Sequence, residues 1–145
     1  SGRPRRLERE PGAGAAGGLG WALMLLGAHR RSGVATVLEA LDFSAEVARH
    51  DLVVTGEGRY DWQSLRGKVV AGVAEAALAS AIPVVVVAGQ VMLGRREVMA
   101  SGVSGAYAVA ETPEQVEAAM LDPVVTLAAR TRRVAATWSP GRDVS

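Results

Sequence analysis

Short apolar runs alternate with alanine-rich stretches along this chain, and this alternation most constrains the fold. The strand candidates are Leu52–Thr55, Pro83–Ala88 and Gly105–Ala110. Helix candidates at Gly67–Ala81 and Arg95–Ala100 separate them. Strands that alternate with helices predict a parallel sheet, and a strand that is apolar at every position, such as 83–88, predicts burial on both faces. The sequence therefore predicts an α/β fold in which helices cover both faces of a parallel sheet.

The segments on either side of this core predict further helices. We expect a helix over Ala13–Ala28, a second from a Ser32 cap through Leu41, and a third from a Ser44 cap through Arg49. At the C-terminal end, Thr112 is expected to cap a helix, and the pair Asp122-Pro123 indicates a break before a final helix that ends near Trp138. In domain terms, we expect residues 1–10 to be a flexible lead-in, 11–138 to form the α/β part, and 139–145 to be a tail.

Composition excludes several classes of protein. A chain of 145 residues that is 49% hydrophobic and 21% charged is typical of one globular domain. The chain has no cysteine, which excludes disulfides, thiolate metal sites and a cysteine nucleophile. The net charge of +1 gives no broad attraction to nucleic acid, and no apolar run is long enough to predict a membrane span.

The segment Thr55–Lys68, with sequence TGEGRYDWQSLRGK, holds most of the candidate chemistry. It follows a predicted strand and contains the only lysine of the chain, Lys68. In parallel sheets, ligands bind at the carboxyl ends of the strands, and a lysine suits a phosphate oxygen or a reacting group. Glu57 or Asp61 has the chemistry to hold Mg²⁺ or to act as a base toward a hydroxyl. The alternative is a solvated loop whose charges pair with one another at the surface.

A second glycine-rich segment lies near the N-terminus. Residues 12–17 match the pattern G-x-G-x-x-G, but no strand precedes them, so the pattern does not predict a dinucleotide site. A helix start whose N–H groups face an anion is the more reasonable hypothesis, and it involves Gly14, Gly17 and Gly18. A P-loop is excluded at Gly67-Lys68, because Trp62 and Val69 occupy positions that the pattern reserves for Gly and for Ser or Thr.

Two long motifs resemble those of the bacterial two-domain glycerate kinases. The first runs from Asp51 to Arg59 and continues through the spaced residues Asp61, Gln63, Ser64, Gly67, Lys68 and Gly72–Ala74. The second is the stretch 11–19, PGAGAAGGL, which lies at a matching distance upstream. The resemblance covers residues 11–138 and implies a Rossmann-like α/β domain that is an incomplete part of a two-domain fold.

The resemblance also implies a function. It implies ATP-dependent phosphorylation of D-glycerate with Mg²⁺ in the cytoplasm, and it leaves open whether the 2- or the 3-phosphate forms. Glu57, Asp61 and Lys68 would be the catalytic groups, and the residues implied in substrate or nucleotide binding are Gly56, Gly58, Arg59, Gln63, Ser64 and Gly67.

The chain matches only the C-terminal part of this family. We therefore expect it to be inactive alone and to self-associate, because missing strands would leave a sheet edge or an apolar face uncovered. The alternative is a non-catalytic α/β ligand-binding or assembly module derived from the family. Three positions depart from the family pattern: Tyr60 replaces an aliphatic residue, Trp62 a small one and Val70 a proline.

Overall fold

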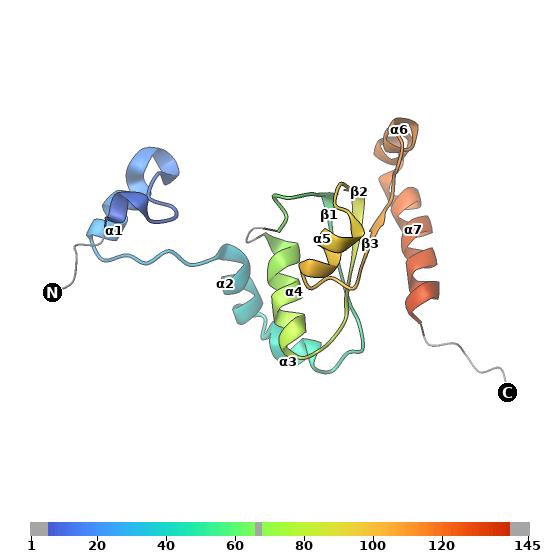
Figure 1. The fold of residues 1–145 in the computed structure, drawn as a ribbon, viewed down its shortest axis with the longest axis horizontal. Coiled ribbons are helices and arrows are strands. Elements are labelled where there is room, and N and C mark those ends of the chain that lie inside the picture. The colour runs from blue at the N-terminus through green and yellow to red at the C-terminus, as the bar shows by residue number, and fades with distance from the viewer. Residues whose placement is uncertain (1–5, 66–67, 140–145) are drawn as a thin grey trace. The chain divides into compact units, whose positions relative to one another are not determined.

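The computed structural model describes residues 6–65 and 68–139. The chain divides into two compact units, residues 1–33 and residues 34–145. The larger unit contains the sheet and is the part of the ribbon in Figure 1 that carries the labels α2 to α7 and β1 to β3.

The sheet is parallel, as predicted. Its strands β1 (Val53–Tyr60), β2 (Val84–Val91) and β3 (Gly105–Ala108) lie in the order β1-β2-β3 within the described residues. Both pairings are parallel, and the register places Val53 beside Val84 and Val86 beside Ala106. The connections between the strands each contain a helix, as parallel neighbours require.

Strand β1 is longer than the sequence predicts. The segment Gly56–Tyr60 was expected in a loop, but it continues β1 and pairs with β2 as far as Tyr60 beside Val91. Glycine has low strand propensity, so the local sequence argues against a strand here. Backbone pairing with the fully apolar strand β2 overrides that preference, and it puts Glu57 on a strand.

Helices cover both faces of the sheet. On one face, Val84, Val86 and Ala88 of β2 pack in two clusters with residues of α3, α4 and α5. On the other face, Val85 and Val87 pack with Val134 and Trp138 of α7. The covering helices on the first face are α2 (Gly33–Ala40), α3 (Phe43–Val47), α4 (Val69–Ala79) and α5 (Arg95–Ala100). The predicted α/β class is confirmed.

The two C-terminal helices begin where their caps predict. Helix α6 (Pro113–Leu121) starts after Thr112, whose hydroxyl accepts a hydrogen bond from the Gln115 N–H at 3.3 Å. Helix α7 (Pro123–Trp138) starts after Asp122, whose carboxylate accepts from the Val125 N–H at 3.2 Å. Each cap satisfies an N–H that lacks a partner inside its helix.

Two of the expected helix starts are wrong. The stretch Ala13–Ala28 is not one helix: α1 covers only Leu19–Leu25, and the backbone before it is left-handed at Ala16 (φ 49°), Gly17 (φ 66°) and Gly18 (φ 99°). Glycine adopts this conformation without a steric penalty, which explains the glycines at a turn rather than inside a helix. Helix α3 begins at Phe43 after a left-handed Asp42, so Ser44 lies inside it and does not cap it.

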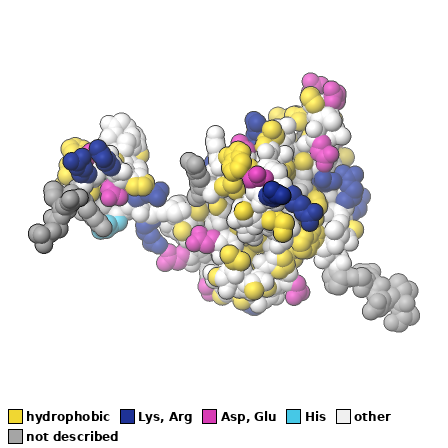
Figure 2. Space-filling view, viewed as in Figure 1, with side chains coloured by type: hydrophobic (Ala, Val, Ile, Leu, Met, Phe, Trp, Pro, Cys, Tyr) yellow, Lys and Arg dark blue, Asp and Glu magenta, His cyan; other side chains and the backbone are white. Residues whose placement is uncertain are grey.

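Several surfaces of the larger unit are apolar. Strand β1 has a free edge in the described sheet, and Val54 on it is 54% exposed. The exposed apolar side chains of α6 and α7 include Met120, Leu121, Val124 and Val125. Figure 2 shows hydrophobic side chains among basic and acidic ones on the visible face. These surfaces motivate the expectation of self-association, which stays a prediction.

Among the described residues, no helix has the length and apolar character needed to cross a membrane.

Candidate functional site

The carboxyl ends of β1 and β2 lie between two pockets. One pocket lies on the α6/α7 face of the sheet and includes Gly56, Glu57 and Gly58. The other lies on the α4/α5 face and includes Tyr60, Trp62 and Ser64. We call them the glycine pocket and the aromatic pocket. The Thr55–Lys68 motif therefore contributes to both faces of the sheet.

Backbone forms the floor of the glycine pocket, which has a volume of about 430 Å³. A Cβ atom on Gly89 would lie 2.5 Å from the Gly58 carbonyl oxygen, and one on Gly56 would collide with the Val87 carbonyl. Only glycine fits at these two positions without a shift of the neighbouring backbone. Helices α6 and α7 supply apolar walls, which include Val116, Ala119, Met120 and Leu127. A flat backbone floor lets a ligand approach the ends of the strands closely.

Glu57 is the one acidic residue among the described residues that line the glycine pocket. Its register partner Ala88 packs on the α4/α5 face of the sheet, so the Glu57 side chain points away from α6 and α7. The residue is half-buried, and its Oε1 atom is buried with no hydrogen-bond partner in the described part of the chain. A buried polar oxygen without a partner is rare, because its desolvation costs about 1–3 kcal/mol and more for a charged group. The geometry therefore calls for a donor or a cation beside Glu57, which fits a ligand hydroxyl or a metal such as Mg²⁺.

Both carboxylate oxygens of Asp61 have partners within the protein, unlike Oε1 of Glu57. Its Oδ1 atom accepts a hydrogen bond from the Gln63 N–H at 2.8 Å, and its Oδ2 atom lies 3.8 Å from Arg59 Nε. The Arg59 side chain is 60% exposed, so this ion pair contributes little to stability. In the described ranges, no group of three or more acidic or histidine side chains comes together in a way that could hold a metal. Of the two carboxylates named for Mg²⁺, Glu57 has the unpartnered oxygen.

Ser64 closes the turn that follows β1. It is fully buried, and its hydroxyl accepts from the Asp61 N–H at 3.2 Å and donates to the Arg59 carbonyl at 3.3 Å. Its own N–H donates to the Asp61 carbonyl at 2.9 Å. These bonds give Ser64 a structural part in positioning Asp61 and the exposed Gln63.

Lys68 stands at the start of α4. It is the N-cap residue of that helix, and its side chain is exposed. The N–H groups at a helix start favour anions, so a cation at this place adds to an electropositive spot. Gly67, a predicted binding residue, lies outside the described residues.

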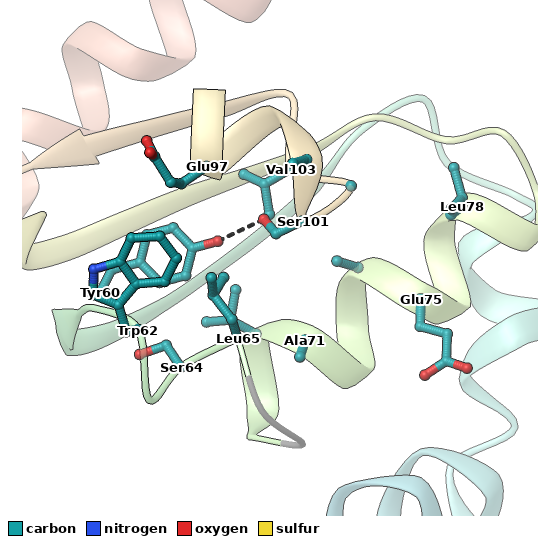
Figure 3. A pocket seen from close by; sticks show the side chains of 14 residues that line it. Tyr60, Trp62, Ser64, Leu65, Ala71, Glu75, Leu78, Glu97, Ser101 and Val103 are labelled. Carbon is teal, nitrogen blue, oxygen red and sulfur yellow. Dashed lines mark hydrogen bonds between the residues drawn. The ribbon is translucent and has the colours of Figure 1, made fainter. Parts of the chain in front are cut away.

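The aromatic pocket has a volume of about 450 Å³ and is lined mainly by α4, α5 and the turn after β1. Tyr60 is fully buried, and its hydroxyl is 2.9 Å from Ser101 Oγ (Figure 3). Burial raises the pKa of the Tyr60 hydroxyl above its ordinary value of 10.0, and the nearby charge of Glu57 adds to this, while the Ser101 hydrogen bond opposes it. Tyr60 is therefore protonated at neutral pH.

Sequence patterns did not identify every residue of these pockets. Gly89 and Gln90 line the glycine pocket, and their place directly after the run 83–88 is the signal that points to them. Glu97 and Ser101 line the aromatic pocket, and no motif marks them. Gly14, Gly17 and Gly18 lie in the smaller unit, and their proposed contact with an anion stays a prediction.

Comparison with known proteins identifies a family. The model of the glycerate kinase family matches residues 3–139. A glycerate 2-kinase of Escherichia coli is 38% identical over 132 residues, which are 90% of this chain and 35% of that protein. A glycerate kinase of Bacillus subtilis is 44% identical over 99 residues, covering 68% of this chain and 26% of the relative. An uncharacterized protein of Mycobacterium tuberculosis is 44% identical over 132 residues, covering 91% of this chain and 35% of the relative.

A solved structure supports the same relationship. The putative glycerate kinase 2 of Salmonella typhimurium matches with a TM-score of 0.58 and 35% identity, over 92% of this chain and 33% of that one. The chain belongs to the glycerate kinase family, and it spans about a third of the length of the curated relatives it matches.

Proposed function

We propose that this chain supplies the C-terminal part of a kinase site that transfers the γ-phosphoryl group of ATP to a hydroxyl of D-glycerate. Membership of the glycerate kinase family and the names of the relatives support this proposal. Phosphoryl transfer needs positioning and charge neutralisation more than covalent chemistry from the protein. The site at the edge of the sheet offers both.

The observation that carries the proposal is the unpartnered Oε1 atom of Glu57 beside a floor of glycine backbone. We expect this carboxylate to accept a proton from a glycerate hydroxyl or to hold Mg²⁺. The glycines at 56, 58 and 89 let ligand atoms approach the strand ends. Lys68 adds positive charge for a phosphate or for the glycerate carboxylate, and Mg²⁺, when bound, would neutralise charge on the phosphate oxygens.

Arg59 and Gln63 would act at the rim of this site. Both side chains are exposed; Arg59 is the last residue but one of β1, and Gln63 lies in the turn that follows. Arginine matches the geometry of a carboxylate, which makes Arg59 a candidate for the acid group of glycerate. A location in the cytoplasm, where ATP is available, is part of the same proposal.

The test is a turnover assay on the protein as its own cells produce it. We expect ADP release that depends on D-glycerate, and identification of the product decides between the 2- and 3-phosphate. Glu57→Gln should lower kcat/KM at least about 100-fold, because it removes a charge aimed at the reacting groups. Glu117→Gln, an exposed carboxylate on α6, is the matched control and should leave turnover unchanged.

Two outcomes would overturn the proposal. Full activity of Glu57→Gln would show that the glycine pocket is not the catalytic site. Saturable binding of ATP and D-glycerate without any turnover in the natural protein would support the non-catalytic binding module instead.

A further inference from the structure

The aromatic pocket has the dimensions of a ligand site and plays no part in the proposed phosphoryl transfer. Its volume of about 450 Å³ lies in the range of small-molecule sites, roughly 300–1,000 Å³. It lies on the face of the sheet opposite the glycine pocket, because its wall residues Val70 and Ala74 pack against Val86 and Ala88, whereas Val87 faces the glycine pocket. A ligand in one pocket therefore does not occupy the other.

We propose that the aromatic pocket binds a small organic cation with a flat apolar body, of the amidinium or aryl-ammonium class. Three features of the described residues support this: a rigid aromatic wall, an exposed indole at the rim, and lining charges of a single sign. The proposal does not depend on the kinase activity.

Tyr60 is fully buried and holds the wall of the pocket in place from behind. Its hydroxyl bonds to Ser101 Oγ at 2.9 Å, and Ser101 donates in turn to the Val98 carbonyl at 2.6 Å. This chain of hydrogen bonds ties the end of β1 to the end of α5 and fixes the ring in place. A preorganised wall lowers the entropy that a ligand loses on binding.

The exposed indole is Trp62, a large aromatic side chain that is 62% exposed. Figure 3 shows its indole at the end of the pocket lining where the Tyr60 ring lies. An indole face is the best aromatic partner for a cation, with about 0.5–1 kcal/mol at exposed sites. Trp62 thus offers a stacking surface for a flat cationic group.

The charges that line the pocket are acidic. Glu75 on α4 and Glu97 on α5 are its charged lining residues, and no described lysine or arginine lines it. Neither carboxylate has a hydrogen bond or an ion pair within residues 6–65 and 68–139. Figure 3 places Glu97 near the aromatic end and Glu75 toward the far end. An apolar cavity with two free carboxylates at its rim favours a cation over a neutral or anionic molecule of the same shape.

The test uses benzamidinium as the probe, with benzamide and benzoate as neutral and anionic molecules of the same shape. Binding is followed by NMR of the natural protein, in which each tryptophan gives one indole N–H signal and the 145 residues of this chain supply three of them. The signal that disappears in Trp62→Phe identifies Trp62. We expect benzamidinium to shift this signal saturably at millimolar concentration and benzamide to bind at least about tenfold more weakly.

Variants make the test specific. In the variants, binding is followed by isothermal titration calorimetry, which needs no indole signal. Glu97→Gln should weaken benzamidinium binding about tenfold, Trp62→Ala should weaken it about 2–5-fold, and Trp62→Phe should weaken it less. Trp21→Phe is the matched control, since Trp21 is another exposed tryptophan and lies in the smaller unit. Glu57→Gln should bind benzamidinium with unchanged affinity. Loss of kinase activity in this variant can therefore be distinguished from loss of binding at the aromatic pocket. Equal affinity for benzamide, or unchanged binding in Trp62→Ala or in Glu97→Gln, would overturn the proposal.

Discussion

The glycine pocket and the aromatic pocket share one strand end but are built in opposite ways. The glycine pocket is shaped by absent side chains, at Gly56, Gly58 and Gly89, and it leaves one oxygen of Glu57 without a partner. The aromatic pocket is shaped by large side chains, Tyr60 and Trp62, and the hydroxyl of Tyr60 is paired with that of Ser101. The first pocket has an open backbone floor and lacks hydrogen-bond partners that a ligand can supply. The second pocket has a wall of side chains that is fixed by a hydrogen bond within the protein.

The difference shows how one motif can serve two purposes. Successive residues of a strand point to opposite faces of the sheet. Gly56 and Gly58 therefore leave one face open as a backbone floor, and Glu57 between them points to the other face. The face with Tyr60 and Trp62, where the chain departs from the family pattern, can change its side chains without altering that floor.

The largest effect should come from Lys68→Ala. In the natural protein, loss of this charge should lower kcat/KM for D-glycerate and ATP about 100-fold or more. Lys68→Arg should restore little activity, because a planar fork does not replace a compact charge. Stability should change by less than about 0.5 kcal/mol, since the side chain is exposed. Arg132→Ala, an exposed cation on α7, is the control. Normal kinetics in Lys68→Ala would show that Lys68 is an ordinary solvated surface residue with no part in catalysis.

The next effect tests the glycine floor. Gly89→Ala should destabilise the fold by about 1–3 kcal/mol, because the new Cβ would lie 2.5 Å from the Gly58 carbonyl oxygen. Gly58→Ala is the matched control, since a Cβ there meets no atom within 4 Å. Urea unfolding measures both. If the two variants lose the same stability, close backbone packing does not explain the glycine at position 89.

A smaller effect tests the wall of the aromatic pocket. Tyr60→Phe removes the hydroxyl that bonds to Ser101 and should lower stability by about 1 kcal/mol. Trp62→Phe should change stability by less than about 0.5 kcal/mol, because that side chain is mostly exposed. Thermal unfolding compares the two variants. A Tyr60→Phe protein as stable as the unchanged one would mean that the hydroxyl does not hold the pocket together.

Some parts of this structure could be predicted from sequence because they depend on local chemistry. The run Pro83–Ala88 predicts a buried strand, and the pairs Thr112-Pro113 and Asp122-Pro123 predict helix starts. The extension of β1 over Gly56–Tyr60 could not be predicted, because pairing with β2 decides it and glycine has no strand preference of its own. The left-handed backbone at Ala16 is equally invisible in the sequence.

The candidate site also has a part that the sequence predicts and a part that only the structure shows. The motif predicted the importance of Glu57, and the structure adds that its oxygen is buried without a partner. The aromatic pocket depends on contacts between distant segments, such as Tyr60 with Ser101, which lie 41 residues apart. Spacing along the chain carries no signal for such a contact.

Hydrogen–deuterium exchange of the natural protein, with and without D-glycerate and a non-hydrolysable ATP analogue, tests the central claim most directly. The claim is that the kinase ligands bind at the glycine pocket and leave the aromatic pocket free. We predict slower exchange at the amides of 56–58 and 89–90 and unchanged exchange at 97–103, which borders the aromatic pocket. Slower exchange at 97–103, with none at 56–58 or 89–90, would contradict the account and place the ligands on the opposite face of the sheet.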